Sequence, residues 1–130
     1  MDFGINGKRA NVCAGSKGLS KACAMALAGE CVNITTVGRG KEALEAVTRE
    51  IRNPGARATD SWKSRMAAMA VPSGKAIDDV ARQRLSSIPA GRFGDPLEFG
   101  QLCTYICSAR ASNMTGQNFL IDGGSYPGTL

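Results

Sequence analysis

Lys8–Gly18 reads K-R-A-N-V-C-A-G-S-K-G, and the rest of the chain is organised around this stretch. The apolar run from Ala10 to Ala14 predicts a buried strand that ends in a loop of small residues. Asn11 lies inside this strand, either as a hydrogen-bonded exception or as a weak point in the core. A helical pattern begins at Leu19. A strand, a glycine-rich turn and a helix N-terminus together are typical of a phosphate-binding loop, because the backbone can approach the ligand closely and free N–H groups favour anionic oxygens.

The segments that follow alternate between strand and helix patterns. Apolar residues spaced three and four apart predict a helix that ends at Gly29: Leu19, Ala22, Cys23, Ala26 and Leu27. Val32–Val37 is β-branched and alternating, so it predicts a second strand. After a glycine turn, Leu44, Val47 and Ile51 mark a second helix. Strands that alternate with helices predict an α/β fold with a parallel sheet.

The second half of the chain is predicted to be mainly helical. Trp62–Ala70 and residues 77–85 each predict a short helix. Asp95 and Glu98 have the spacing of a capping box, with Asp95 as the N-cap of the next helix. Asn118–Asp122 predicts one last strand before a pair of glycines.

Composition restricts the function classes. The chain has 130 residues, no histidine and a net charge of +5, with its bases spread over all segments. This pattern predicts one domain and no nucleic-acid partner. No apolar run is long enough for a membrane span, and residues 1–7 lack a signal-peptide core, so we expect a cytoplasmic location. The spacing of the five cysteines predicts no metal site.

Two stretches resemble the short-chain dehydrogenase/reductase family, and their residues are most similar to those of 3-oxoacyl reductases. The first is V-C-A-G-S-K-G-L-S, at residues 12–20. The second is I-P-A-G-R-F-G-D-P-L-E-F-G, at 88–100, followed by T-G-Q-N-F-L-I-D-G-G at 115–124. The resemblance implies a Rossmann-like, doubly wound parallel sheet that binds a nicotinamide dinucleotide. It also implies hydride transfer between that cofactor and a carbonyl or alcohol.

The glycine loop departs from the family pattern T-G-x-x-x-G-x-G. Cys13 replaces the threonine, Ala14 the first glycine and Ser20 the third, whereas Gly18 is retained. We therefore expect phosphate binding to be weakened. The resemblance places cofactor contacts at seven residues: Ala14, Gly15, Ser16, Lys17, Gly18, Leu19 and Arg39.

The charges near this loop favour NADP over NAD. NAD sites of this type usually have an acidic residue at the end of the second strand, which holds the ribose hydroxyls. Gly38 and then Arg39 stand there instead, and Lys17 lies in the loop itself. Two bases suit the 2′-phosphate of NADP, since arginine chelates phosphate oxygens. The alternative is that both are solvated surface bases.

The resemblance also shows what is missing. Chains of the family are about twice as long, so strands one, two and last would be retained in a truncated sheet, and strands three to six would be missing. The catalytic serine and the tyrosine and lysine of Y-x-x-x-K belong to the missing part. Ala109 stands four residues after Tyr105, and Leu130 stands four residues after Tyr126. We therefore predict no catalytic residue in this chain.

We expect residues 1–130 to form a single truncated domain. It would consist of a cofactor-binding half at 1–55, a helical segment at 56–94 and a C-terminal helix, strand and tail at 95–130. Loss of the central strands would leave the edge of strand one bare. Either the last strand moves beside strand one, giving the order 2-1-last, or a second chain associates through the C-terminal helix and strand.

Three functions remain open at this point. The chain could be an NADP binder of the oxidoreductase family without activity of its own. It could be an interaction module, either as a homo-oligomer or in association with a full-length relative. It could also be a non-functional remnant.

Overall fold

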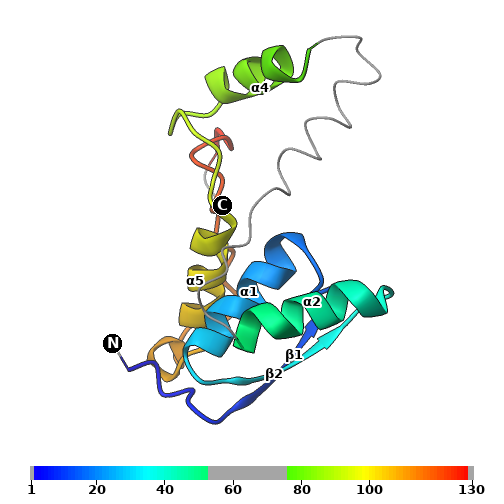
Figure 1. Cartoon of the computed structure of the whole chain (residues 1–130). Coiled ribbons are helices and arrows are strands. Elements are labelled where there is room, and N and C mark those ends of the chain that lie inside the picture. The colour runs from blue at the N-terminus through cyan, green and yellow to red at the C-terminus, as the bar shows by residue number, and fades with distance from the viewer. Residues whose placement is uncertain (1, 53–75, 129–130) are drawn as a thin grey trace. The chain divides into compact units, whose positions relative to one another are not determined.

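The computed structural model describes residues 2–52 and 76–128 (Figure 1). These residues fall into two compact units. The first unit contains residues 2–52 and 95–117, and the second contains residues 76–94 and 118–128. The helix predicted over Trp62–Ala70 lies outside the described residues. The single domain with three segments stays a prediction.

The first unit contains a parallel two-stranded sheet. Strand β1 (Arg9–Cys13) pairs with β2 (Asn33–Val37), with Arg9 opposite Asn33 and Cys13 opposite Val37. Both strands and their parallel direction are confirmed, so the fold class is α/β. Figure 1 shows helices α1 (Gly18–Gly29) and α2 (Lys41–Arg52) on the same side of this sheet.

The prediction that the first strand is buried is wrong, since one of its faces is exposed. Side chains along β1 and β2 alternate between exposed and half-buried, because helices cover only one face of the sheet. Asn11 lies on the exposed face, so this polar side chain is neither a weak point in a core nor in need of a buried partner. Ala10 and Ile34, on the opposite face, pack against the hydrophobic core.

Helices α1 and α2 are joined by an ion pair and by apolar packing. The Nζ atom of Lys21 lies 2.6 Å from Oε2 of Glu50, and these side chains are only 15% and 27% exposed. Val47 of α2 is fully buried. Both helices confirm the predicted 3.6-residue pattern. They have 12 residues each, and no helix in the described part of the chain is both long and apolar enough to cross a membrane.

The C-terminus of α1 is closed by a Schellman motif rather than by Gly29 itself. The N–H of Cys31 donates to the carbonyl of Ala28, and the N–H of Val32 donates to that of Leu27. Cys31 stands at the position that reverses the chain and has φ of 59°, in the left-handed region where glycine is preferred. Leu27 and Val32 are both buried in the core cluster, which supplies the apolar contact that accompanies this motif.

Replacing Cys31 by glycine is expected to stabilise the chain by about 0.5–1 kcal/mol. A Cβ in the left-handed region costs about 1–2 kcal/mol, and the larger backbone entropy of unfolded glycine offsets part of the gain. Urea denaturation measures the difference. The matched control is Cys107→Gly. Cys107 is the C-cap of the helix at Pro96–Ile106, where φ is −77° and glycine relieves no backbone strain. An equal gain in both variants would contradict the assignment of strain to Cys31.

Helix α5 (Pro96–Ile106) begins with the predicted capping box. The N–H of Leu97 donates to Oδ1 of Asp95 at 2.8 Å, and the N–H of Asp95 donates to Oε2 of Glu98 at 2.8 Å. The helix packs extensively against α1, and a short 3-10 turn, η1 (Ala109–Ala111), follows it. The core beneath these elements is formed by Ile5, Leu27 and Val32, with four partly buried side chains around them: Phe3, Ala10, Ile34 and Cys103.

The second unit contains helix α4 (Ile77–Ser86), as predicted, and a turn built on Asp122. The carboxylate of Asp122 accepts the N–H of Gly124 at 3.0 Å and that of Tyr126 at 2.8 Å. The N–H of Ala90 donates to the carbonyl of Gly123 at 3.0 Å. These bonds hold the D-G-G stretch against the chain that follows α4.

The last strand predicted over Asn118–Asp122 is not formed, so the sheet order 2-1-last is wrong. The sheet of the described residues has two strands, β1 and β2. A strand exists only through pairing with a neighbour, and residues 118–122 have no neighbouring strand in the described chain. Their β-branched and aromatic composition is therefore insufficient to make a strand.

Candidate functional site

The predicted cofactor loop and the turn after β2 lie at the same end of the sheet. Residues 14–17 connect β1 to α1, and Gly38 and Arg39 directly follow β2. Because the strands are parallel and Cys13 pairs with Val37, the two loops leave neighbouring strand ends. The structure thus brings the two predicted parts of the site together at the carboxyl end of the sheet's strands.

Thr36 is a contact of this loop that the sequence analysis did not single out. A Cβ on Gly15 would lie 3.0 Å from Cγ2 of Thr36 and 3.2 Å from the carbonyl oxygen of Val12. Gly15 is therefore buried against β2, and the loop has no room for a side chain there. The strand alternation was the available signal, since it places Thr36 on the face covered by helices.

The N-terminus of α1 has no side-chain cap from its own N-cap residue or first turn. Lys17 is the N-cap residue in an extended conformation, its side chain makes no capping hydrogen bond, and the first turn contains no acidic residue. Gly18 begins the helix with φ of 65°. The first N–H groups of a helix have no partner within the helix. This end of α1 can therefore donate to anionic oxygens.

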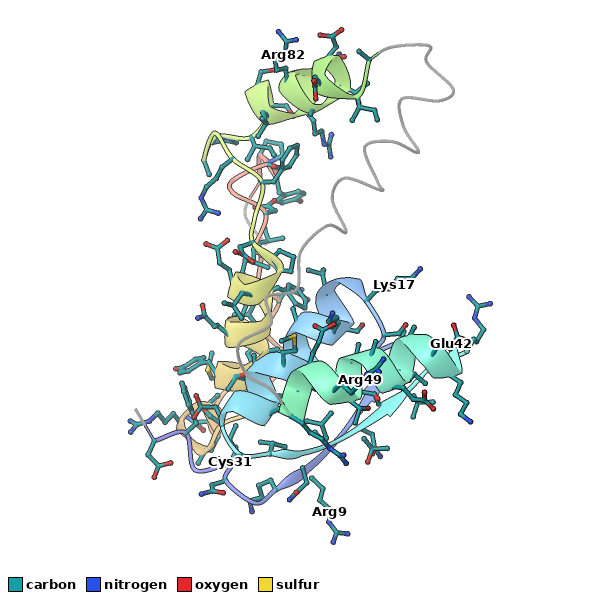
Figure 2. All side chains as sticks on the ribbon, in the orientation of Figure 1. Arg9, Lys17, Cys31, Glu42, Arg49 and Arg82 are labelled. Carbon is teal, nitrogen blue, oxygen red and sulfur yellow. The ribbon has the colours of Figure 1, made fainter. Side chains whose placement is uncertain are left out.

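The two bases predicted to face a phosphate are exposed. Lys17 and Arg39 have no ion-pair partner in residues 2–52 and 76–128. Figure 2 shows the Lys17 side chain extending outward beside the start of α1. Lys41, at the start of α2, is 3.9 Å from Glu45 and so is partly neutralised. Among the described residues at this end of the sheet, Lys17 and Arg39 are therefore the cations without an acidic partner.

The backbone conformation of Ala14 is a physical reason for the weakened phosphate binding that the sequence predicts. It occupies the position of the family's first glycine and has φ of 55°. A residue with a Cβ in this conformation is strained by about 1–2 kcal/mol, whereas glycine is not. The sequence alone could not decide the sign of this φ angle. The other predicted contacts are the half-buried Ser16 and the exposed Leu19.

Replacing Ala14 by glycine is expected to raise the free energy of unfolding by about 0.5–1 kcal/mol, because the strain exceeds the entropy that glycine adds to the unfolded chain. The matched control is Ala43→Gly on the exposed face of α2, which is expected to lower stability by about 1 kcal/mol through helix propensity. Denaturant titration of both variants measures the contrast. Equal losses would show that the left-handed conformation at Ala14 carries no cost.

The thiols of Cys23 and Cys103, on α1 and α5, are buried and half-buried, whereas Cys107 at the C-cap of α5 is exposed. Burial raises the pKa of Cys103, and the neighbouring Cys23 thiol adds to this effect. Burial and Cys103 likewise raise the pKa of Cys107. These thiols stay protonated at neutral pH and are poor nucleophiles. Among the described residues, no group of histidine, cysteine or acidic side chains is placed to hold a metal ion.

Tyr105 and Tyr126 have no adjacent lysine of the kind that the family's reaction uses. Tyr105 lies on α5 and is 38% exposed, and Tyr126 follows the Asp122 turn of the second unit and is 50% exposed. The sequence has Ala109 and Leu130 four residues after them. What the described site can do chemically is hold an anion at the start of α1.

Comparison with known proteins identifies relatives of one kind. The profile of a family described as enoyl-(acyl carrier protein) reductase matches residues 63–126. A tropinone reductase homologue of Arabidopsis thaliana is 38% identical over 60 residues, which are 45% of this chain and 23% of the relative. The 3-oxoacyl-[acyl-carrier-protein] reductase of Vibrio harveyi is 39% identical over 49 residues, which are 38% of this chain and 20% of the relative.

A third relative has a different printed name. The oxidoreductase UcpA of Escherichia coli is 40% identical over 48 residues, which are 37% of this chain and 18% of the relative. In each case the match spans only about a fifth of the relative's own length. Together with the motifs at residues 12–20, 88–100 and 115–124, these matches show that parts of the chain are similar to the short-chain dehydrogenase/reductase family.

Proposed function

We propose that this chain binds NADP weakly at the β1–α1 loop and does not reduce carbonyl compounds on its own. Similarity to this family supports a nicotinamide dinucleotide as the ligand class. The observation that carries the proposal is the uncapped N-terminus of α1, which stands at the same sheet edge as Arg39. Phosphate oxygens would accept from the helix N–H groups there.

The charges of the two loops support NADP over NAD. Gly38 and Arg39 follow β2, so no carboxylate stands at the strand end to accept from the ribose hydroxyls of NAD. The guanidinium of Arg39 and the ammonium of Lys17 have no ion-pair partner among the described residues and would contact a 2′-phosphate. Both are exposed, and the strained Ala14 is the first residue of the loop. These features make the proposed affinity low.

The lack of a paired tyrosine supports inactivity. Family chemistry needs a tyrosine beside a lysine, whose positive charge lowers the tyrosine's pKa so that it can exchange a proton with the carbonyl oxygen. Neither tyrosine of this chain has that lysine in the motif spacing. The cofactor, when bound, would supply hydride chemistry, but this chain would present no matched proton donor.

Calorimetric titration is expected to show NADP binding with a Kd of roughly 0.1–1 mM and weaker binding of NAD. Arg39→Ala should weaken NADP binding roughly fivefold, because an exposed charge-assisted contact contributes about 1 kcal/mol, and should leave NAD binding unchanged. The matched control is Arg9→Ala, since Arg9 begins β1, at the end of the strand opposite the loop. Absence of NADP binding at millimolar ligand, or an equal loss in both variants, would refute the site.

Activity is tested separately. NADPH oxidation with ketone and 3-oxoacyl substrates is expected to stay at the uncatalysed background. Sustained turnover by the purified chain would refute the inactivity while leaving the binding site in place.

A second candidate function is association with another chain. The edge of β1 that pairs with no strand of the described residues and the exposed run Phe119, Leu120 and Ile121 favour it. Co-expression with a full-length relative followed by size-exclusion chromatography tests this role, and separate elution of the two chains would exclude that partner.

A further inference from the structure

Helices α1 and α5 cross so closely that the crossing point has no room for a side chain. A Cβ on Gly100 of α5 would lie 2.6 Å from the carbonyl oxygen of Ala22 and 3.1 Å from the Cβ of Ala26, both on α1. The distance between packed helices is set by the side chains at their contact, and small residues allow the two backbones to approach. Side chains within one turn of this crossing can therefore meet across the helix pair.

Three cysteine thiols lie together beside this crossing. Cys23 directly follows Ala22 on α1, and Cys103 stands three residues after Gly100 on α5. The thiol of Cys103 is hydrogen-bonded to those of Cys23 and Cys107, so its sulfur is in contact with both of the others. Cys23 is buried, Cys103 is half-buried and Cys107 is exposed. The cluster belongs to the first compact unit alone, and it extends from the end of α5 into the helix pair.

The surroundings of these thiols favour pairing with one another over other thiol chemistry. Among the described residues, no group of side chains is placed to hold a metal ion. Burial raises the pKa of Cys103 and of Cys107, which makes both slow nucleophiles towards a substrate. A disulfide across two helices requires backbones that approach closely, because the Cβ atoms must come within about 3.5–4.5 Å of each other. The crossing at Gly100 provides such an approach.

We propose that this cluster is a site of reversible oxidation by hydroperoxides, at which a disulfide forms between Cys23 and Cys103, with Cys107 as the thiol that reacts first. The Cys107 thiolate attacks one peroxide oxygen and becomes a sulfenic acid, and water or an alcohol leaves. The Cys103 thiolate then attacks the Cys107 sulfur, a disulfide forms and water leaves. Cys23 finally attacks the Cys103 sulfur as a thiolate, and Cys107 departs as a thiolate and is protonated.

The reaction balances, and the geometry sets its direction. Two thiols lose two electrons and two protons, and one hydroperoxide takes them up to give an alcohol, or water, and a second molecule of water. Side chains four residues apart on a helix have Cβ atoms about 5–6 Å apart, which exceeds the span of a disulfide. A bond between Cys103 and Cys107 therefore distorts the last turn of α5, and exchange with Cys23 relieves that distortion.

Peroxide treatment of the reduced whole chain tests the site. At about pH 8.5, where more of each thiol is ionised, hydrogen peroxide should consume two of the five thiols and lower the intact mass by two hydrogen atoms. Peptide mapping after alkylation should recover a link between Cys23 and Cys103, and dithiothreitol should reverse it. A link through Cys13 or Cys31, a link between two chains, or thiols that all stay unlinked overturns the proposal.

Variants separate the cluster from the other thiols. Cys103→Ser should abolish the link, and so should Cys23→Ala, which keeps an apolar group in the helix contact. Cys31→Ser is the matched control and should leave the link unchanged, since Cys31 is exposed and lies beyond the end of α1. Cys107→Ser should slow formation of the same link at least roughly fivefold, because the remaining thiols are less accessible to peroxide. An unchanged rate in Cys107→Ser would contradict its role as the first thiol.

Thermal unfolding tests the packing that the link requires. The oxidised chain should have a Tm roughly 5–10 °C higher than the reduced chain, because the disulfide closes a long loop between residues 23 and 103 of the unfolded chain. A Tm that falls on oxidation would mean that the two thiols do not face each other across α1 and α5. None of these measurements requires NADP.

Discussion

Replacing Gly100 by alanine is expected to destabilise the first unit by about 2 kcal/mol and to lower its Tm by roughly 10 °C. A Cβ at this position would stand 2.6 Å from the carbonyl oxygen of Ala22 and 2.9 Å from its carbonyl carbon. Both are backbone atoms of α1, so no side chain can rotate away. The two helices would have to separate, and the packing between them would be lost along their contact.

The expected loss of stability in Gly100→Ala is opposite in sign to the change that helix propensity alone predicts. Alanine is favoured over glycine in a helix interior by about 1 kcal/mol, so a net loss at Gly100 isolates the tertiary contact. Gly29→Ala is the matched control, because a Cβ at the last residue of α1 meets nothing within 4 Å. It should be neutral or slightly stabilising in the same urea titration. If Gly100→Ala behaves like Gly29→Ala, α5 does not pack against α1 as described.

The elements of the fold that have a local cause were predicted from the sequence. The pattern Val32–Val37 predicts a strand because β-branched residues alternate, and Asp95 with Glu98 predicts a helix start because the two side chains satisfy nearby backbone groups. The position of the β1–α1 loop follows from the same logic. These features depend on residues within one turn or one strand, which a sequence displays directly.

The features that were missed depend on contacts distant in sequence or on backbone angles. Gly100 has no local signal, since only the crossing with Ala22 explains it, although small residues at 22, 26 and 100 are consistent with a close helix approach. The left-handed φ angles of Ala14 and Cys31 could not be predicted from the sequence, because neither alanine nor cysteine favours this region. Residues 118–122 have the composition of a strand, but pairing requires a neighbour that the described chain does not provide.

Leu27→Ala is expected to lower the free energy of unfolding by about 3 kcal/mol. Leu27 is 5% exposed and contacts the core formed with Ile5 and Val32. Truncation removes buried apolar surface, leaves a cavity and deletes the apolar contact of the Schellman motif at the end of α1. The matched control is Leu97→Ala on α5, where the side chain is 45% exposed and the expected loss is below about 1 kcal/mol.

The same variant separates the scaffold from the proposed cofactor site. Leu27 lies nine residues after Gly18, and at 1.5 Å per residue it is about 14 Å along α1 from the loop. Below the unfolding transition, the affinity for NADP should therefore be unchanged in Leu27→Ala, and the stabilisation by ligand should follow the same concentration dependence as in the unsubstituted chain. A parallel loss of affinity in the folded variant would mean that the N-terminus of α1 is not positioned independently of the core at its far end.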